Sequence, residues 1–276
     1  MLRLELYKIF KRPRTYISFG VVTAITCLIQ LAMLADGKSF IQFILQSASN
    51  DFSIEGNVLN GYLITYIILQ SLLIQIPLLV ALVAGDLIAG EANMGTLRLL
   101  LTKPISRTRL VLVKFAAGLV YTMLLLIWFA IIGLGLSVLL FGSGDLINIK
   151  SDSIVFLLEN EVLWRYGYAF GFAFLAMSTV TALAIFLSVL AENSVGPIIG
   201  TMGVIIVLMI FTNLELPLFN LVKPYLFTTH MIAWKGFFDA PIQYGEIMNS
   251  AIILVLYIIG FLLATIIIFN KKDIKS

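Results

Sequence analysis

The stretch LVLVKFAAGLVYTMLLLIWFAIIGLGLSVLLF, residues 110–141, carries one charged side chain, Lys114. An α-helix rises about 1.5 Å per residue, so about 20 apolar residues cross the hydrocarbon core of a bilayer, which is about 30 Å thick. The stretch is therefore long enough to span a membrane as a helix. A transmembrane β-barrel would show shorter segments that alternate apolar and polar side chains.

The composition of the whole chain agrees with this interpretation. Of its 276 residues, 61% are hydrophobic and 12% are charged, and the mean hydropathy is +1.05. Soluble domains carry about 25% charged residues. Apolar runs of the required length predict about six spans, at 15–35, 58–83, 110–141, 166–190, 195–211 and 249–269. We therefore expect an all-α integral membrane protein, with 1–276 as a single transmembrane domain.

Basic residues predict the orientation of these spans. Lys and Arg gather before the first span, between the second and third spans, and after the last span. The positive-inside rule places such segments in the cytoplasm, so we expect both termini to be cytoplasmic. The basic surface is explained by topology and by contact with anionic membrane lipids, and we expect no nucleic-acid partner.

The N-terminal segment 1–14 has the pattern of an amphipathic helix. Leu2, Leu6, Ile9 and Phe10 fall on one helical face, with basic side chains beside them, and Pro13 ends the pattern. We expect an elbow helix that lies in the membrane interface before the first span. A frayed tail is the alternative, because the segment is short for an isolated helix.

A polar cassette, GEANMGTLRLLLTKPISRTRLVLVK at residues 90–114, separates the second and third spans. We expect a helix from Asp86 to Leu101 that exposes Glu91 and Arg98, and we expect Pro104 to stop it. Ser106 then caps the helix of the third span. The segment 85–109 is thus predicted to be a stiff cytoplasmic elbow, or, in the simpler interpretation, a basic loop that obeys the positive-inside rule.

The cassette resembles the first cytoplasmic loop of the type-2 export family of ATP-binding cassette (ABC) permeases. That family repeats an acidic residue, Gly-Thr-Leu, paired leucines, Pro-(Ile or Val)-Ser-Arg and a downstream Lys at this spacing. The matching positions here are Glu91, Gly95, Thr96, Leu97, Leu99, Leu100, Pro104, Ile105, Ser106, Arg107 and Lys114. The resemblance extends to the elbow helix, the six spans and a longer outer segment before the last span.

The resemblance implies that this segment is a coupling helix that docks on a separate ATPase. The residues it assigns to docking are Glu91, Gly95, Thr96, Arg98, Pro104 and Arg107, together with Glu192 in the second inner loop. Arg107 could instead bind a lipid phosphate, and Glu91 could cap a helix. The implied partners are two ABC ATPase subunits and a second permease, identical or paralogous, in a bacterial plasma membrane.

Enzymatic function is not expected from this chain. The sequence GEANMGT, residues 90–96, has the glycine spacing of a phosphate-binding loop but lacks its lysine, so ATP and Mg²⁺ would be bound by the partner ATPase. Ser178 and Ser188 have no histidine base within the expected spans, so we do not expect either to be a nucleophile. Cofactors and metals are not expected in the chain itself.

The outer segment 213–248 is rich in aromatic residues and proline, and is too interrupted to cross a membrane. We expect it to be re-entrant or to pack at the level of the lipid headgroups. His230 within it is assigned a capping or packing role. Two glycine pairs, Gly167 with Gly171 and Gly196 with Gly200, predict close helix packing, either within the chain or at a dimer seam.

The sequence thus favours a non-catalytic permease subunit of an ABC-type exporter that forms the substrate pathway as a dimer. Its cargo would be an amphipathic drug, peptide or lipid. The alternatives are a membrane scaffold or assembly factor that recruits a cytoplasmic partner, and an independent secondary carrier. The apparent lack of ionisable residues near the middle of the expected spans argues against a carrier.

Overall fold

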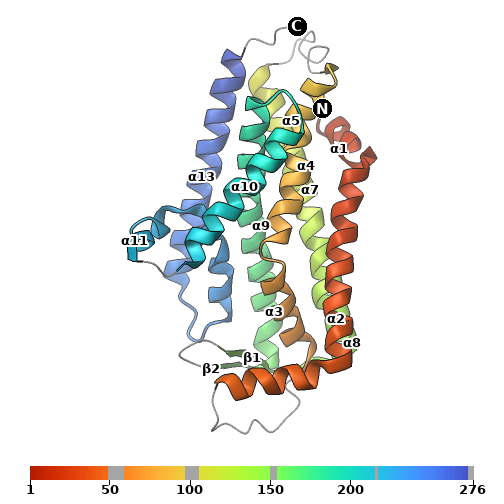
Figure 1. Cartoon of the computed structure of the whole chain (residues 1–276), viewed down its shortest axis with the longest axis vertical. Coiled ribbons are helices and arrows are strands. Elements are labelled where there is room, and N and C mark those ends of the chain that lie inside the picture. The colour runs from red at the N-terminus through yellow and green to blue at the C-terminus, as the bar shows by residue number, and fades with distance from the viewer. Residues whose placement is uncertain (49–58, 97–105, 150–153, 215–216, 273–276) are drawn as a thin grey trace.

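The computed structural model describes residues 1–48, 59–96, 106–149, 154–214 and 217–272. Within these residues, six helices are long and apolar enough to cross a membrane: Pro13–Gly37, Gln75–Asn93, Arg107–Phe141, Glu159–Leu190, Val195–Asn213 and Tyr244–Lys271. The helices run along the long axis of an elongated bundle (Figure 1). The prediction of an all-α membrane protein with about six spans is confirmed.

The chain begins with a short helix, α1 (Leu2–Lys11), at one end of the bundle (Figure 1). Arg12 has an extended backbone, as expected before a proline, and α2 (Pro13–Ala48) starts at Pro13. Asp36 has non-helical dihedral angles, and beyond it α2 turns and runs across the opposite end of the bundle. The first spanning helix therefore ends close to the predicted boundary.

The second span is not the single helix that the sequence predicts over 58–83. It consists of α3 (Gly61–Ser71) and α4 (Gln75–Ala84), and α4 continues directly into α5 (Asp86–Asn93). Pro77 explains the break, because it has no N–H to donate to the Leu73 carbonyl and its ring crowds that carbonyl. The expected helix from Asp86 to Leu101 is also interrupted, since Gly95 has a φ of +68°.

The third span begins as predicted at Ser106, whose side chain accepts a hydrogen bond from the Arg109 N–H at 3.3 Å. It comprises α7 (Arg107–Ala130), a π-helical turn η1 (Ile131–Gly135) and α8 (Leu136–Phe141). Side chains of neighbouring helices satisfy carbonyls of the π-turn. Gln30 donates to the Ile132 carbonyl, and Thr65 donates to the Gly133 carbonyl.

A short antiparallel hairpin, β1 (Leu146–Ile149) and β2 (Ile154–Leu157), closes the end of the bundle opposite α1. Its register pairs Leu146 with Leu157. Helices α9 (Glu159–Leu190) and α10 (Val195–Asn213) then supply the fourth and fifth spans. The fourth starts several residues before the predicted 166, because polar residues at its start form helix rather than loop.

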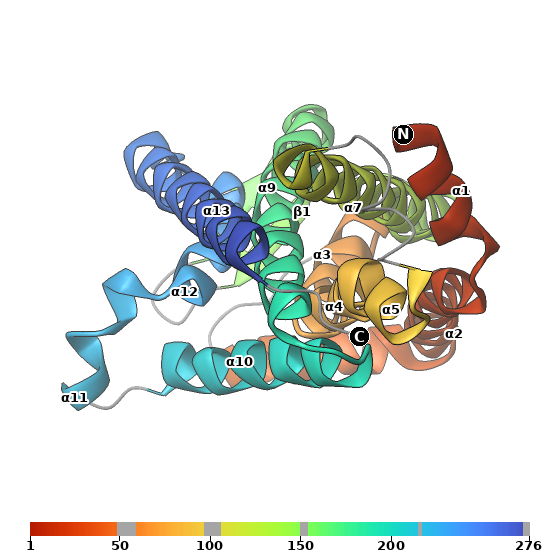
Figure 2. The ribbon, with the colours of Figure 1, turned by 90° about the horizontal axis from the view of Figure 1, so that it is seen from above.

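Helix α9 is the central element of the bundle and contacts α4, α5, α7, α10 and α13 (Figure 2). It approaches α7 closely, because a Cβ at Gly118 would lie 2.8 Å from Cγ2 of Thr181. Beside this contact, the buried hydroxyls of Thr122 and Thr181 are hydrogen-bonded at 3.1 Å. Gly167 and Gly171 differ, since a Cβ at either would meet no atom of the described residues within 4 Å. Among those residues, neither glycine mediates close helix packing.

The outer segment forms four short helices, α11 (Pro217–Asn220), η2 (Lys223–Tyr225), α12 (Phe227–Met231) and η3 (Ile232–Phe238). Phe227, Trp234, Phe237 and Phe238 of this segment are buried in the bundle, and the Phe238 ring lies 5.2 Å from that of Tyr66. His230 has the expected packing role, because its ring nitrogens are hydrogen-bonded to Ser250 Oγ and the Pro224 carbonyl.

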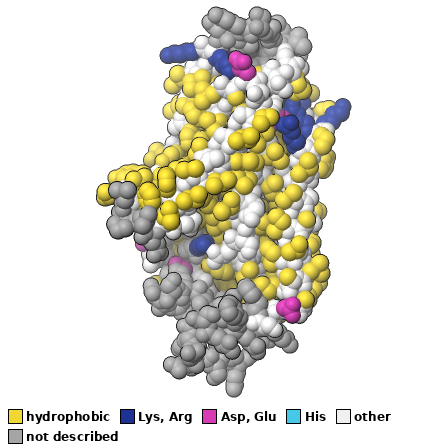
Figure 3. Space-filling view, viewed as in Figure 1, with side chains coloured by type: hydrophobic (Ala, Val, Ile, Leu, Met, Phe, Trp, Pro, Cys, Tyr) yellow, Lys and Arg dark blue, Asp and Glu magenta, His cyan; other side chains and the backbone are white. Residues whose placement is uncertain are grey.

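The last span, α13 (Tyr244–Lys271), returns to the end at which α1 lies (Figure 1). On the face drawn in Figure 3, hydrophobic side chains cover the middle of the bundle, and Lys and Arg side chains gather mainly near the α1 end. A broad apolar belt of this kind is what a surrounding bilayer requires. The chain is therefore a multi-pass membrane protein.

Candidate functional site

Four charged side chains meet in the interior at the α1 end of the bundle. Lys114 of α7 is completely buried, and Glu5 of α1 and Glu91 of α5 are each more than nine-tenths buried. Lys8 of α1 closes the group at its edge, with its side chain 39% exposed. We call these four residues the charge ring.

Each carboxylate of the charge ring bridges both ammonium groups. Glu5 lies 2.8 Å from Lys8 Nζ and 3.0 Å from Lys114 Nζ, and Glu91 lies 2.7 Å from each. Lys114 donates hydrogen bonds to Glu5 Oε2 at 3.0 Å and to the Leu87 carbonyl at 2.7 Å, and its contact with Glu91 Oε2 is an ion pair. The ring is neutral overall and joins α1, α5 and α7.

The two ring members in α1 have shifted pKa values. Burial raises the pKa of Glu5, but the charges of Lys114 and Lys8 and the hydrogen bonds from them outweigh burial, so its pKa lies below the ordinary value of 4.5. Burial lowers the pKa of Lys8, but hydrogen bonds and charge interactions with Glu5 and Glu91 raise it above the ordinary 10.5. Both shifts favour the charged forms.

A second ionic contact lies one helical turn earlier in α5. The buried Asp86 carboxylate pairs with Arg12, and its Oδ1 lies 3.1 Å from Arg14 Nη1. Gly90 leaves room for this carboxylate, because a Cβ there would lie 2.5 Å from Asp86 Oδ1 and would displace it. The start of α2 is therefore tied to α5 as well.

The other side of α5 is held by α9. The backbone N–H groups of Ile88 and Ala89 both donate to Ser188 Oγ, at 3.2 and 2.8 Å. These N–H groups lie in the first turn of α5, where a helix lacks backbone acceptors. Ser188 thus serves as a structural acceptor that joins α5 to α9.

Glu91 does not lie where the sequence predicts it. It is 3% exposed rather than solvent-facing, because α5 continues the buried α4 and Lys8 and Lys114 neutralise its charge. Arg107 is also engaged within the chain: its Nη1 donates to the carbonyls of Phe269 and Lys272, at 2.9 and 2.8 Å. These carbonyls belong to the end of α13, so Arg107 caps that helix.

The remaining predicted docking residues lie at the surface of the same end or outside the described residues. Gly95 and Thr96 are exposed, Met94 beside them is 57% exposed, and Glu192 is exposed in the loop after α9. Arg98 and Pro104 fall within 97–105, outside the described residues. A surface around Met94 and Glu192 thus remains accessible to a partner.

Sequence reasoning missed Glu5, Lys8, Asp86 and the inward role of Lys114. Two signals were present. Lys114 is the single charge in a long apolar run, and a lysine within a span needs a buried partner. Glu5 is an acidic residue in an otherwise basic helix, four positions before the buried Ile9, so both face the bundle.

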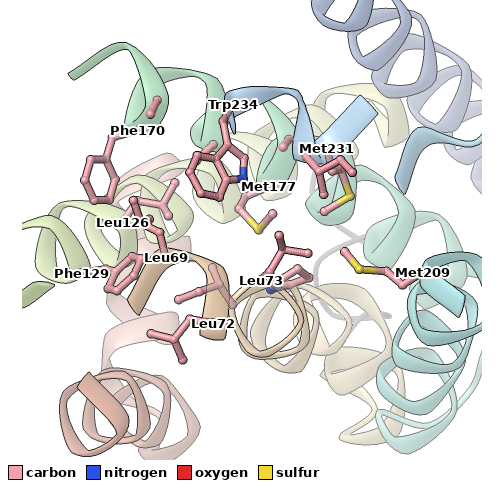
Figure 4. A pocket seen from close by; sticks show the side chains of 16 residues that line it. Leu69, Leu72, Leu73, Leu126, Phe129, Phe170, Met177, Met209, Met231 and Trp234 are labelled. Atoms are coloured by element: carbon pink, nitrogen blue, oxygen red, sulfur yellow. The ribbon is translucent and has the colours of Figure 1, made fainter. Parts of the chain in front are cut away.

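An apolar cavity lies beside the break between α3 and α4 (Figure 4). Leu72 and Leu73 of the break, Met177 of α9, Met209 of α10 and Trp234 of η3 are among the side chains around it. Its volume is about 50 Å³. Pockets that hold drug-sized ligands measure about 300–1,000 Å³. The cavity is therefore too small for such a ligand in this conformation.

Comparison with known proteins places the chain in a family. It is 26% identical over 238 residues to "Uncharacterized protein YhcI" of Bacillus subtilis (strain 168), an alignment that covers 82% of this chain and 75% of the relative. A family model described as "Protein of unknown function (DUF2705)" matches residues 23–275. Since that match covers most of the chain, the protein belongs to the DUF2705 family.

Proposed function

We propose that the chain is the membrane permease subunit of an ABC-type exporter, driven by a separate cytoplasmic ATPase. The observation that carries the proposal is the charge ring, which fixes the beginning of the ABC-like cassette to α1 and α7. A motor bound outside the membrane needs an element that is rigidly joined to spanning helices. Helix α5 has this property, because it continues α4 and is tied to α1, α2, α7 and α9.

In this proposal the cassette residues have two different tasks. Glu91 and Arg107 hold the helices together, whereas the exposed Met94, Gly95, Thr96 and Glu192 contact the ATPase. Gly95 has a positive φ and no atom within 4 Å of its Cβ position, so a partner surface can approach its backbone closely. Arg98 and Pro104 follow in the chain and remain predicted contacts.

The proposed location is a bacterial plasma membrane, with the α1 end facing the cytoplasm. The basic residues of α1, the start of α7 and the end of α13 support this orientation under the positive-inside rule. Helix α1 would then lie at the inner membrane surface, where its Lys and Arg side chains meet anionic lipid headgroups. ATP and Mg²⁺ would be bound by the partner ATPase.

The substrate pathway is proposed to form between two permease copies, identical or paralogous. The resemblance of the cassette to that of the type-2 export permeases, which pair to enclose a pathway, supports this arrangement. The cargo would be an amphipathic drug, peptide or lipid, since the exposed surfaces of α10 and α13 are apolar.

A membrane scaffold that recruits a cytoplasmic partner is the second candidate function. The exposed surface at Met94 favours it, because that surface would serve equally as the dock of a scaffold. ATP-dependent transport in proteoliposomes separates the two functions. An independent secondary carrier is less favoured, because the buried charges described above are paired with one another and gather at one end of the bundle.

The test is co-purification of the tagged chain with ATPase subunits from its host. Met94→Arg and Glu192→Arg should each lose a stoichiometric ATPase that the wild type retains. Glu159→Arg is the matched control, because Glu159 is exposed at the opposite end of α9. Equal recovery of the ATPase with all four proteins, or its absence from the wild type, would contradict the proposal.

A further inference from the structure

Three methionines from three different helices line the apolar cavity beside the α3–α4 break. They are Met177 of α9, Met209 of α10 and Met231 of α12, and each is more than nine-tenths buried. Figure 4 shows their side chains extending toward the cavity. The chain has nine methionines, so a third of them gather around this void. The cavity therefore has a wall rich in thioether sulfur.

The packing of the helices holds these methionines beside one another. Helices α9, α10 and α12 contact one another pairwise. The hydroxyls of Thr212 in α10 and Thr228 in α12 are hydrogen-bonded at 2.9 Å. Met209 and Met231 each lie three residues from one of these threonines, and residues three apart share a helix face. Met209 and Met231 thus lie on the sides of α10 and α12 that face each other.

The lining of the cavity suits a soft cation. Thioether sulfur is a polarisable ligand that selects soft ions such as Cu(I), whereas magnesium and calcium prefer oxygen ligands. Among the described residues, the side chains around the cavity are aliphatic, aromatic or thioether. The aromatic ones are Phe129, Phe170 and Trp234, and an aromatic face attracts a cation. The same part of the chain holds no group of three His, Cys, Asp or Glu side chains that could bind a harder metal.

The cavity also has the size that one ion needs. Its volume is about 50 Å³, and about 10–15 Å³ is enough for one water molecule. A monovalent metal ion without its water shell is smaller than a water molecule. Methionine has three rotatable side-chain bonds, so the sulfur atoms can adjust their positions around an ion. One ion and its three sulfur ligands can therefore be accommodated.

We propose that Met177, Met209 and Met231 form a site for one soft monovalent cation, Cu(I) or its analogue Ag(I). The three thioether sulfurs are the ligands, and they replace the water that the ion loses on entry. Because the ligands come from separate helices, local sequence pattern does not reveal them, and the sequence predicts no metal. The site goes beyond the proposed function, and its occupation requires no ATPase.

The test measures binding of Ag(I) to the purified full chain in phosphatidylcholine nanodiscs, by equilibrium dialysis and elemental mass spectrometry. Every protein carries Cys27→Ala, which removes the only cysteine of the chain, so that no thiol competes for silver. This background protein should bind one Ag(I) per chain. X-ray absorption at the silver edge should show three sulfur neighbours.

Substitutions of single methionines locate the site. Met209→Leu conserves apolar volume, so the variant should fold. It should weaken Ag(I) binding by at least about tenfold, because loss of even an outer-shell partner costs about 10–100-fold in metal affinity. Met177→Leu should have a similar effect, which makes the result independent of one substitution. Met123→Leu is the matched control, because Met123 of α7 is 52% exposed, and it should leave the affinity unchanged.

Two results would overturn the proposal. One is the absence of stoichiometric Ag(I) from the background protein, as expected of a cavity that accepts only apolar occupants. The other is an equal affinity for Ag(I) in the Met209→Leu and Met123→Leu variants.

Discussion

Lys114 Nζ of α7 lies 2.7 Å from Glu91 Oε2 of α5, and both side chains are buried. The two residues belong to the polar cassette 90–114, yet they face each other inside the chain. A buried ion pair adds little net stability over apolar side chains, but loss of one partner leaves an uncompensated buried charge. We therefore expect substitution of either residue alone to lower the free energy of unfolding strongly.

Lys114→Met should destabilise the protein by about 3–5 kcal/mol, because Glu5 and Glu91 would both lose a buried partner. Thermal unfolding in detergent measures this loss. Lys271→Met is the control, since it removes the same charge from an exposed position at the same end of the bundle. Equal unfolding midpoints for the two variants would contradict the role of the charge ring.

The stability that Glu5 provides should depend on pH. Its folded pKa lies below 4.5, so its contribution is complete above 4.5 and is lost as the pH falls through the folded pKa. Lys8 has a raised pKa, so its contribution is complete below 10.5 and is lost as the pH rises through the folded pKa. Both contributions are thus complete between 4.5 and 10.5.

Glu5→Gln tests this dependence. The variant should unfold at a lower temperature than the wild type at neutral pH, and the difference should shrink as the pH falls below 4.5. Glu91 and Lys114 lie in the same ring as Glu5. The unfolding temperatures of variants at all three positions should therefore be measured over the same pH range. A difference that stays constant through the acid range would show that the Glu5 charge is not involved.

Much of the fold could be predicted from the sequence, because hydrophobic length and charge determine where a helix can cross a membrane. The span 195–211 and the Ser106 cap illustrate this. The break before Pro77 depends on a single residue within an apolar run, and hydropathy does not register it. The charge ring depends on contacts between positions 5, 91 and 114, which local pattern does not reveal.

Gly118→Ala should destabilise the protein by about 1–3 kcal/mol, the usual cost of overpacking. The new Cβ would lie 2.8 Å from Thr181 Cγ2 and would push α7 away from α9. Gly167→Ala is the matched substitution, with no atom within 4 Å of its Cβ, and should be neutral or slightly stabilising. The thermal unfolding midpoints of the two variants provide the measurement. A lower midpoint for Gly167→Ala than for Gly118→Ala would refute the close approach of α7 and α9.

Arg107→Gln should loosen the end of α13 by about 1.5–3 kcal/mol, since charged hydrogen bonds to the carbonyls of Phe269 and Lys272 are lost. Hydrogen exchange in the last turn of α13 should accelerate. Arg109→Gln, at an exposed neighbouring position, should leave that exchange unchanged. Unchanged exchange in both variants would mean that Arg107 is free for another role.

Photo-crosslinking from position 94 in living cells tests the proposed dock most directly. A benzophenone amino acid replaces Met94 and, as a control, Glu159. Position 94 should capture a protein that mass spectrometry identifies as an ATPase with a phosphate-binding loop, and position 159 should not. Capture of no ATPase from position 94, or equal capture from both positions, would contradict the proposed dock.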